Sequence, residues 1–298
     1  MSILIGLLGL VTLVSLFWRS RWPIELLTHF RPQLIVAGAL CALLCLVLGE
    51  RWEWAAISLG LTLVNYAALP APRWIKPESR LASTPGLTVV WANVWKKREP
   101  LRRTLEWAKS RNADLILIGE FPEMDPATCL LDDYPHRVDT GLEPAGGYLT
   151  RVTVFSRVPL VGVELPPWPG PHHRPWIKFD VDVGGKALAI VVVHPPPPYS
   201  NKMLHERDQH IVSLADHMRE PFVLAGDFNA TPWCPVFKSI PGRRVGSYLF
   251  KPTWFSSLPL LGLPIDHIMT SPTLKASAYE VAKATGSDHR ALLARIHP

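Results

Sequence analysis

The sequence predicts an α/β fold: a four-layer α/β sandwich of two mixed β-sheets, preceded by three transmembrane helices. Three apolar runs with few charges occupy the first 71 residues, and short strand-like runs outnumber helical segments after residue 86. Hairpins and longer crossovers both join these strands, which predicts sheets of mixed direction with helices outside them. We therefore expect a three-helix transmembrane region at 1–71, a linker at 72–85 and one folded domain at 86–298.

The transmembrane prediction depends on the three apolar runs, Ile3–Phe17, Leu34–Leu48 and Trp54–Leu69. Each is near the lower length limit for crossing a hydrocarbon layer of roughly 30 Å, and none has the polar stripe of a surface helix. Tryptophans of the kind found at membrane interfaces flank the runs: Trp18, Trp22, Trp52, Trp54 and Trp74. The alternatives are a buried helical cluster and a cleaved signal peptide, but the first run lacks a basic start and a cleavage site. We expect a multi-pass protein of the cytoplasmic (inner) membrane.

Basic residues favour one orientation of such a protein. They fall between the first two runs and again after the third, at Arg19, Arg21, Arg31, Arg73, Lys76 and Arg80. Both segments lie on the same side of the expected membrane region. The excess of Arg and Lys that cytoplasmic loops carry would place this side, and the domain after it, in the cytoplasm. Because the loops are short, the membrane face remains open.

The region after residue 86 begins with elements of a layered sheet. Leu87–Val94 has the composition of a strand, and Glu99–Arg111 that of a helix. Asp114–Gly119 is a short continuous apolar run, typical of a strand buried on both faces. Tyr148–Ser156 is a further strand. These segments predict a first sheet with a crossover helix.

A hairpin and a second helix follow. Apolar and polar residues alternate over Ile177–Val183, and Gly184-Gly185 turns the chain into Ala187–Val193, which is a hairpin by both period and turn chemistry. One helical face is formed by Leu204, Ile211, Leu214 and Met218. The remaining predicted strands are Phe222–Ala225, Ile265–Met269 and Ala291–Ile296.

Charge and cysteine content exclude little and imply no special class. The formal net charge of +6 is modest and does not demand the clustered basic surface of a duplex-binding domain. Cys41 and Cys45 lie inside an apolar run, while Cys129 and Cys234 are isolated. No disulfide framework or zinc motif follows from this spacing, so the redox compartment stays open.

The candidate functional residues are polar side chains at the ends of apolar strands. Such positions from distant parts of the chain can meet at one edge of a sandwich, and buried carboxylates there are costly without a partner. They are Asn93, Glu120, His194, Asp227, Asn229, Asp266, Asp288 and His289. Carboxylates with water suit a hard divalent cation such as Mg²⁺. For Glu120, at the end of DLILIGE, we expect this role.

Spacing within two motifs indicates how the side chains point. Asp227 and Asn229 are two residues apart in GDFN, so in an extended chain they project together. The carboxylate could activate a water molecule while the amide donates to a phosphoryl oxygen. The alternative is an Asx-turn.

The SDH motif needs a third residue. Asp288 and His289 are neighbours and point oppositely, so another carboxylate must fix the His289 tautomer, and Asp266 is the candidate. Asp288 is then available to a metal. His194 precedes four prolines that would hold it toward a phosphate. The alternatives are a surface loop for the Asp288-His289 pair and an ordinary strand-end histidine for His194.

Taken in order, these motifs resemble the endonuclease/exonuclease/phosphatase family, which has the DNase I-like fold. The resemblance covers roughly residues 87–296. Its motifs are the strand ending at Asn93, LIGE at Glu120, FSRVPL around Ser156, VHPPPP at His194, GDFNATPW at Asp227, PIDHI at Asp266 and GSDHR at His289. The apolar runs, HPPPP, Thr253-Trp254 and GLPIDHI look like a membrane-anchored bacterial branch.

The resemblance implies a metal-dependent phosphoesterase. Glu120 would hold Mg²⁺, with Mn²⁺ as the alternative ion, assisted by Asn93 and Asp288. Asp266 would orient His289 as general base, and Asp227 would position or activate the water. The resemblance also implies that Asn229 and His194 stabilise the charge on phosphorus-bound oxygens. No covalent phosphoenzyme is expected.

Departures from the family pattern bear on the substrate. Repair nucleases of the family commonly have Asp two residues after the Asn and Gln before the metal Glu, where this chain has Trp95 and Gly119. We expect hydrolysis of a phosphodiester, diphosphate or phosphomonoester, with a lipid-linked phosphate favoured because tethering concentrates an enzyme near membrane lipids. Similar anchored members act outside the cytoplasm, which opposes the orientation that the basic residues favour. The alternatives are a DNA or RNA nuclease and a non-catalytic membrane scaffold.

Overall fold

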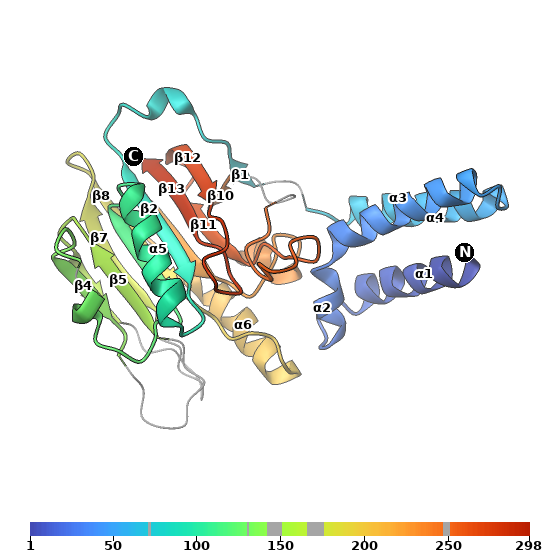
Figure 1. The fold of residues 1–298 in the computed structure, drawn as a ribbon, viewed down its shortest axis with the longest axis horizontal. Helices are drawn as coiled ribbons and strands as arrows, with labels where there is room; N and C mark the ends of the chain where they lie inside the picture. Colours follow the sequence, from blue (N-terminus) through green and yellow to red (C-terminus); the bar gives the residue numbers. More distant parts are fainter. Residues whose placement is uncertain (71–72, 130, 142–150, 166–175, 247–250) are drawn as a thin grey trace.

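The computed structural model describes residues 1–70, 73–129, 131–141, 151–165, 176–246 and 251–298. Figure 1 shows two parts: a group of helices at the N-terminus, and two β-sheets with helices on their outer faces. The α-helices are α1 (Ser2–Phe17), α2 (Ile24–Thr28), α3 (Arg31–Val47), α4 (Trp52–Ala67), α5 (Arg98–Ser110) and α6 (Asn201–Ser213). Short 3-10 helices are η1 (Ser79–Leu81), η2 (Pro126–Cys129), η3 (Leu214–His217) and η4 (Pro235–Ser239).

The two sheets are both mixed. The seven-stranded sheet has the order β1 (Trp74–Ile75), β10 (Arg243–Val245), β11 (Asp266–Thr270), β9 (Phe222–Asp227), β8 (Ala187–Val193), β7 (Ile177–Asp182), β6 (Val161–Glu164). The six-stranded sheet has the order β12 (Lys275–Val281), β13 (Leu292–His297), β2 (Leu87–Asn93), β3 (Leu115–Gly119), β5 (Val152–Ser156), β4 (His136–Asp139). Three neighbouring pairs are parallel, namely β2–β3, β8–β9 and β1–β10.

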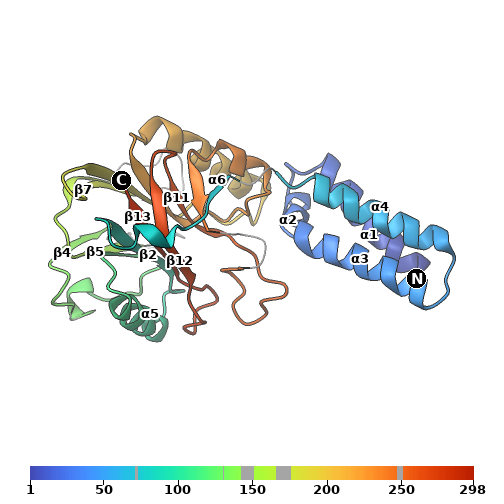
Figure 2. The same cartoon turned by 90° about the horizontal axis from the view of Figure 1, so that it is seen from above.

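The central strands β2, β3, β5, β9 and β11 form because their side chains are buried on both faces. One core lies between the sheets and contains Trp91, Leu117, Ile190 and Ile268. A second core packs the six-stranded sheet against α5, and a third packs the seven-stranded sheet against α6. Figure 2 shows α5 and α6 on opposite outer sides of the sheets. The predicted four-layer sandwich of mixed sheets is therefore correct.

Several elements differ from the sequence prediction. Strand β1 lies inside the segment expected to be a linker and pairs with β10. Strands β4, β6 and β12 are short or carry half-buried and exposed residues, so they lack the apolar runs by which strands are recognised. The predicted strand Tyr148–Ser156 is described from residue 151 on, and its first three residues lie outside the described part.

Strand direction brings the carboxyl ends of four strands to one edge. Asn93 ends β2 opposite Gly119, the last residue of the parallel strand β3. In the other sheet, Val193 of β8 pairs with Gly226 of β9, and Asp227 pairs with Asp266 at the start of the antiparallel β11. Residues at or just after these positions consequently face a common region where the two sheets meet.

The N-terminal helices are shorter than the transmembrane prediction requires. Helices α1, α3 and α4 contain 16, 17 and 16 residues, which at 1.5 Å per residue gives about 24–26 Å. A spanning helix needs about 20 apolar residues for a core of roughly 30 Å. Among the described residues no helix combines the length and apolar character needed to cross a membrane. The three predicted transmembrane helices, and with them the multi-pass inner-membrane location, are wrong.

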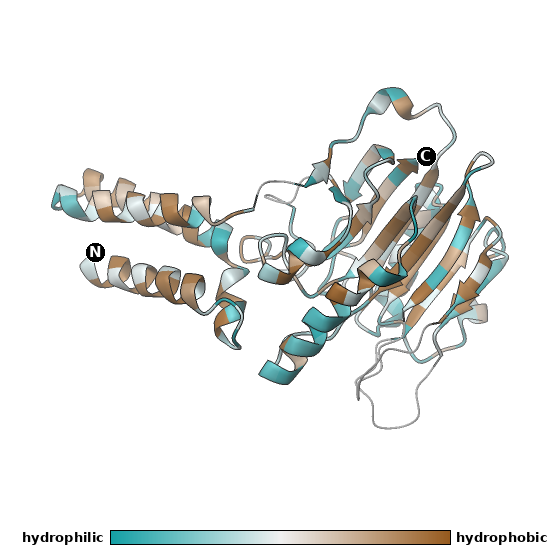
Figure 3. Ribbon diagram, turned by 180° about the vertical axis from the view of Figure 1, so that it is seen from behind, coloured by the Kyte–Doolittle hydropathy of each residue, from teal (hydrophilic) through white to brown (hydrophobic). Residues whose placement is uncertain are grey.

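Polar side chains lie between these helices. Asn65 of α4 donates to Thr12 of α1 (2.9 Å), and the buried Arg31 of α3 donates to the Ser15 carbonyl (3.1 Å). Figure 3 shows hydrophobic residues along the lengths of α1, α3 and α4. Many of them are exposed, including Leu7, Leu10, Leu40, Leu43, Leu59 and Leu63.

Helix α2 joins the N-terminal helices to the sandwich. Near its start, the Trp22 amide donates to Asn201 Oδ1 at the beginning of α6 (3.1 Å). The carbonyl of His29 accepts from Trp233 Nε1 (2.9 Å), and Gln33 Nε2 donates to the Gly262 carbonyl (3.2 Å). These contacts hold the residues on both sides of α2, and the first turn of α3, against the start of α6, the loop after β9 and the loop before β11.

Candidate active site

The amide of Asn93 lies at the centre of the converging side chains. Its Nδ2 is 3.2 Å from Glu120 Oε1, 3.3 Å from Asp227 Oδ2 and 3.5 Å from His289 Nε2. These residues follow or end β2, β3 and β9 or precede β13, so both sheets contribute to one cluster. Its Oδ1 accepts from the Trp95 amide (3.0 Å), which fixes the amide nitrogen toward the carboxylates. In this arrangement Asn93 holds the carboxylates by hydrogen bonds.

Asp266 orients His289. Its Oδ2 lies 2.9 Å from His289 Nδ1, and because a carboxylate accepts, Nδ1 carries the proton that it donates. The other oxygen of Asp266 accepts from Trp91 Nε1 (2.8 Å), and the Asp266 amide donates to Thr253 Oγ1 (3.1 Å). With Nδ1 fixed in this way, His289 Nε2 faces Asp227 Oδ2 at 3.7 Å.

Asp227 is held from two further directions. Its Oδ1 accepts from the Asn229 amide (2.9 Å), and His194 Nε2 lies 3.5 Å from its Oδ2. Burial and the neighbouring Asp266 charge raise the pKa of Asp227 to about 7, against the opposing effect of His289. Burial would lower the pKa of His289, but Asp266 and Asp227 outweigh it and raise this pKa to about 10. The cluster therefore stabilises a proton on His289.

Local backbone geometry is strained at this edge. Glu120 has a φ of 52° and Asn229 a φ of 48°, in the left-handed region that costs a non-glycine residue of order 1–3 kcal/mol. Gly119, directly before Glu120, allows the Trp91 ring to pack on β3, because a Cβ there would lie 2.6 Å from Trp91 Cη2. The departure at position 119 from the family pattern thus has a packing cause.

Two predicted residues make other contacts. Asp288 is half-buried, and its carboxylate lies 3.3 Å from Trp254 Nε1 and 3.4 Å from Ser287 Oγ. The Asn229 side chain donates from Nδ2 to the Pro195 carbonyl (3.0 Å), so it joins the loop after β9 to the one after β8. Within the described part of the chain, the mutual contacts of the cluster therefore join Asn93, Glu120, His194, Asp227, Asp266 and His289.

The cluster suits a divalent cation. Ligand atoms of Asp227, Asp266 and His289 all lie within 4.8 Å of one another, and Glu120 adds a half-buried carboxylate. Oxygen donors with excess negative charge are the set that hard cations such as Mg²⁺ prefer. Because Asp266 is committed to His289 and Trp91, Glu120 and Asp227 are the carboxylates best able to bind an ion.

Sequence reasoning missed residues that support the cluster from outside it. Trp91 could have been found, because it lies two residues before Asn93 on the same face of β2. Thr253 was noted only as part of a motif. Glu25 and Arg207 carried no signal, since their contacts join segments 182 residues apart.

An apolar rim lies beside the cluster. Trp254 stacks on Phe255 with 5.4 Å between ring centroids, and the Ser256 amide donates to the Asp288 carbonyl (2.9 Å). The segment that follows exposes three leucines, with 51% of Leu258, 89% of Leu260 and 51% of Leu261 accessible. Trp95, whose amide donates to Asn93 Oδ1, is 47% exposed.

Solved structures with the same fold include three with informative names. An endonuclease/exonuclease/phosphatase from Beutenbergia cavernae is 19% identical, with 72% of each chain covered and a TM-score of 0.58. TDP2 from D. rerio, complexed with a single-strand DNA product, is 14% identical, with 72% of this chain and 99% of that chain covered and a TM-score of 0.57. The 3′ phosphatase NExo from Neisseria, bound to a product DNA hairpin, is 18% identical, with 71% and 100% covered and a TM-score of 0.52.

Comparison at the sequence level gives the family. No curated protein matches this chain. The family model described as "Endonuclease/Exonuclease/phosphatase family" matches residues 90–289, which contain every member of the cluster. The chain therefore belongs to the endonuclease/exonuclease/phosphatase family, whose members are metal-dependent hydrolases acting on phosphodiester or phosphomonoester bonds.

Proposed function

We propose that this chain hydrolyses a phosphoester bond by direct attack of water, using the cluster around Asn93. The carrying observation is the chain of contacts from Trp91 through Asp266 to His289, whose Nε2 faces Asp227. Such an arrangement holds one imidazole nitrogen ready to take a proton while a carboxylate stands beside it. Phosphate esters need this kind of positioning and charge stabilisation more than covalent chemistry.

Each residue of the cluster has a role in the proposed reaction. Glu120 and Asp227 would hold a Mg²⁺ or Mn²⁺ ion, which would neutralise phosphate oxygens and lower the pKa values of nearby groups. Asp227 orients the water, and His289 Nε2 takes its proton. Asp266 stabilises the resulting imidazolium. In the ion-free protein Asp266 and Asp227 raise the His289 pKa, and positive charge bound by Glu120 and Asp227 would lower it again and leave Nε2 free to accept the proton.

The remaining polar groups act on the phosphate. His194 lies beside Asp227, where its ring can donate to a phosphoryl oxygen. Asn229 keeps Asp227 in place through its backbone amide, and its side-chain Nδ2, which donates one hydrogen to the Pro195 carbonyl, has a second hydrogen for a phosphoryl oxygen. Asn93 holds Glu120 and Asp227 in register. No side chain in this arrangement needs to become phosphorylated.

We further propose that the substrate carries an apolar group, as a lipid-linked phosphate does. The support is the rim beside Asp288, where Trp254, Phe255 and the exposed Leu260 follow one another. An exposed leucine makes no favourable contact with a highly charged ligand. Against a hydrocarbon chain, it contributes roughly 25 cal/mol of binding free energy per Å² of apolar surface removed from water.

Nucleic acid is the second candidate substrate. Two of the similar solved structures hold a DNA product, and the exposed ring of Trp95 beside Asn93 offers a surface on which a base can stack. A nuclease would show a steep loss of binding with added salt, because phosphate contacts release counterions. Binding of a lipid phosphate, whose hydrocarbon chain is uncharged, would depend much less on the salt concentration.

The test uses the full chain with Mg²⁺ in mild detergent. The rate of hydrolysis of an aryl phosphodiester measures the chemical step. Separate assays compare the rates on an isoprenoid diphosphate, a lipid phosphate and plasmid DNA. We expect metal-dependent turnover that Asp227→Asn abolishes, and preference for a substrate with an apolar chain. Preference for DNA would replace the lipid proposal. Equal rates for wild type and Asp227→Asn on every substrate would favour a non-catalytic scaffold.

A further inference from the structure

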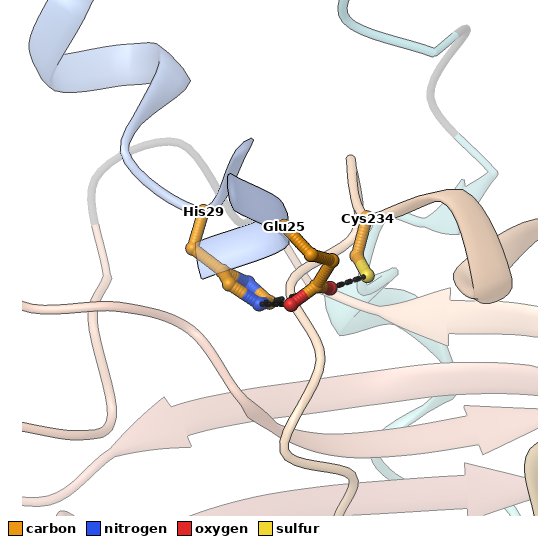
Figure 4. Close-up of side chains that lie close together, drawn as sticks. All are labelled: Glu25, His29 and Cys234. Atoms are coloured by element: carbon orange, nitrogen blue, oxygen red, sulfur yellow. Dashed lines mark hydrogen bonds and ion pairs between the residues drawn. The ribbon is translucent and has the colours of Figure 1, made fainter. Parts of the chain in front are cut away.

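Helix α2 presents two polar residues to the loop after β9. Glu25 of α2 and His29, the residue that caps its C-terminal end, are one helical turn apart, and both are buried. Figure 4 shows the Glu25 carboxylate between the His29 ring and the thiol of Cys234, which lies in that loop. The Cys234 thiol donates to Glu25 Oε1 (2.7 Å), and His29 Nε2 lies 3.2 Å from the same oxygen. A buried carboxylate with these neighbours needs a positive charge to balance it.

Arg207 of α6 supplies this positive charge. Its side chain is fully buried, with Nη2 at 2.9 Å from Glu25 Oε1 and 2.7 Å from Asp208 Oδ1. The other terminal nitrogen, Nη1, donates to the carbonyl of Asn229 (2.9 Å). Glutamate, histidine and cysteine together are also zinc ligands. Here the guanidinium already occupies the side of Glu25 that an ion would share, and its Nη2 reaches Cys234 Sγ at 3.5 Å.

The loop after β9 is held at three successive residues. Arg207 fixes the carbonyl of Asn229, and His267 Nε2 lies 2.9 Å from the carbonyl of Ala230. The hydroxyl of Thr231 is 3.0 Å from His29 Nδ1. Two of the three contacts therefore depend on α2, one directly through His29 and one through Glu25 and Arg207.

Of the three loop residues, Asn229, whose carbonyl Arg207 contacts, has a strained backbone. Asn229 has a φ of 48°, so a loop released from its partners relaxes toward ordinary backbone angles. Its amide donates to Asp227 Oδ1, and a change in its backbone consequently turns the Asp227 carboxylate. The path from α2 to the cluster is Glu25, Arg207, Asn229 and then Asp227, each in contact with the next.

We infer that Glu25 and Arg207 are positioning residues for Asp227, so that the N-terminal helices complete the active site of the sandwich. The kinetic part of this inference rests on the proposed function. Burial would raise the pKa of Glu25, but His29 and Arg207 outweigh it and hold the pKa at about 2. The carboxylate is therefore ionised at neutral pH and keeps the guanidinium in place.

The test is Glu25→Gln in the full chain. This change keeps the size of the side chain and removes the charge that holds Arg207. We expect kcat for an aryl phosphodiester to fall about 10- to 100-fold, the effect of a small misplacement of a reacting group, with KM little changed. Hydrogen exchange should rise in the segment 228–234 and stay unchanged in α5 and β2.

Asp216→Asn is the control. Asp216 is an exposed carboxylate of η3, the turn that follows α6, so its removal leaves Arg207, Glu25 and Asp208 in place and we expect wild-type kcat and wild-type exchange in 228–234. Cys234→Ser tests the zinc alternative. We expect it to behave as wild type, whereas zinc that copurifies with wild type and is lost in Cys234→Ser would assign the cluster to a metal and overturn the inference.

The outcomes separate the inference from the proposed function. An active wild type with unchanged kcat and exchange in Glu25→Gln overturns the positioning role alone. A wild type without turnover would exclude the proposed function. The positioning role would then be tested by hydrogen exchange alone, which should rise in 228–234 in Glu25→Gln. If Glu25→Gln does not fold, Glu25→Asp keeps the charge and shortens the side chain. Wild-type kcat and exchange in that variant would contradict the inference, and a local rise in exchange would support it.

Discussion

The sandwich and the N-terminal helices distribute polar side chains in opposite ways. The sandwich buries apolar residues in three cores and carries a cluster of carboxylates and imidazoles at one edge, where Asp227 and His289 meet. The helices bury Thr12, Arg31 and Asn65 between them and expose leucines. Clustered polar side chains therefore lie at the functional edge of the sandwich, whereas in the N-terminal helices they lie in the interior. Two buried carboxylates also differ in their effect on the free energy of unfolding: Asp227 lies in the sandwich, and Glu25 lies at its junction with α2.

The largest expected effect is at Asp227, in the sandwich. Asp227→Asn should lower kcat about 10³-fold, since a group that activates water contributes typically 10²–10⁴-fold. The same variant should be more stable. Because burial and Asp266 raise the Asp227 pKa from 3.8 to about 7, ionising this group costs folding free energy as pH rises through 7. Turnover and thermal unfolding of metal-free protein at pH 8 measure both effects.

A less stable Asp227→Asn variant would contradict this reading. The matched control is Asp180→Asn, a carboxylate that pairs with Arg219 near the surface of β7. It should leave turnover and unfolding temperature close to those of wild type, since exposed ion pairs contribute little.

The next largest effect is at Glu25, at the junction with α2. Ionisation of this carboxylate stabilises the fold, whereas ionisation of Asp227 destabilises it. The pKa of Glu25 is lowered from 4.5 to about 2, so its ionised form contributes stability that is fully present above pH 4.5. This stability is lost as pH falls from 4.5 toward 2. A shift of this size corresponds to about 3 kcal/mol. Urea unfolding between pH 7 and pH 3 should show a steeper loss of stability in wild type than in Glu25→Gln. Parallel curves for the two proteins would exclude the ion pair as a source of stability.

The sequence predicts the sandwich well because its signal is local. Continuous apolar runs such as Leu115–Gly119 form strands in any layered sheet, and the polar residue that ends each run marks the edge. The pairing of Asp266 with His289 could also be expected, since neighbours on a strand point oppositely. Trp91 could be found from its place on the face of β2 that carries Asn93, but its contact with Asp266 and the contact of Arg207 with Glu25 join distant segments that no spacing encodes.

Hydropathy misled the prediction for the helices for a physical reason. Apolar composition identified α1, α3 and α4 correctly as helices, and the ends of the apolar runs lie within three residues of the helix ends. The error was to accept runs near the lower length limit as spanning, although helices of 16 or 17 residues are shorter than the roughly 20 residues that a bilayer core requires. Arg31, which the prediction used as a loop charge, is buried inside α3 and contacts Ser15.

A smaller effect is expected at the centre of the sandwich. Trp91→Phe removes the indole donor to Asp266 and leaves a buried carboxylate oxygen without that hydrogen bond, at a cost of about 1–3 kcal/mol. His289 keeps its contact with the other oxygen, so kcat should fall less than in Asp227→Asn. The pH dependence of kcat tests the mechanism, because a less firmly held Asp266 changes the apparent pKa of His289. Trp107→Phe on α5, away from the cluster, is the control and should leave the pH profile unchanged.

The smallest expected effect lies among the N-terminal helices and sharpens the comparison most directly. Asn65→Leu removes the donor to Thr12 and the acceptor for Arg31 Nη1 (3.4 Å). The change deprives Thr12 of a partner and weakens the contacts of Arg31, so we expect a loss of about 1–2 kcal/mol, measured by urea unfolding. Turnover should stay at the wild-type level, because Asn65 has no contact with α2 or the cluster. If Asn65→Leu instead stabilised the protein, the polar interior of these helices would contribute nothing to their packing, and burial of apolar surface would govern both regions alike.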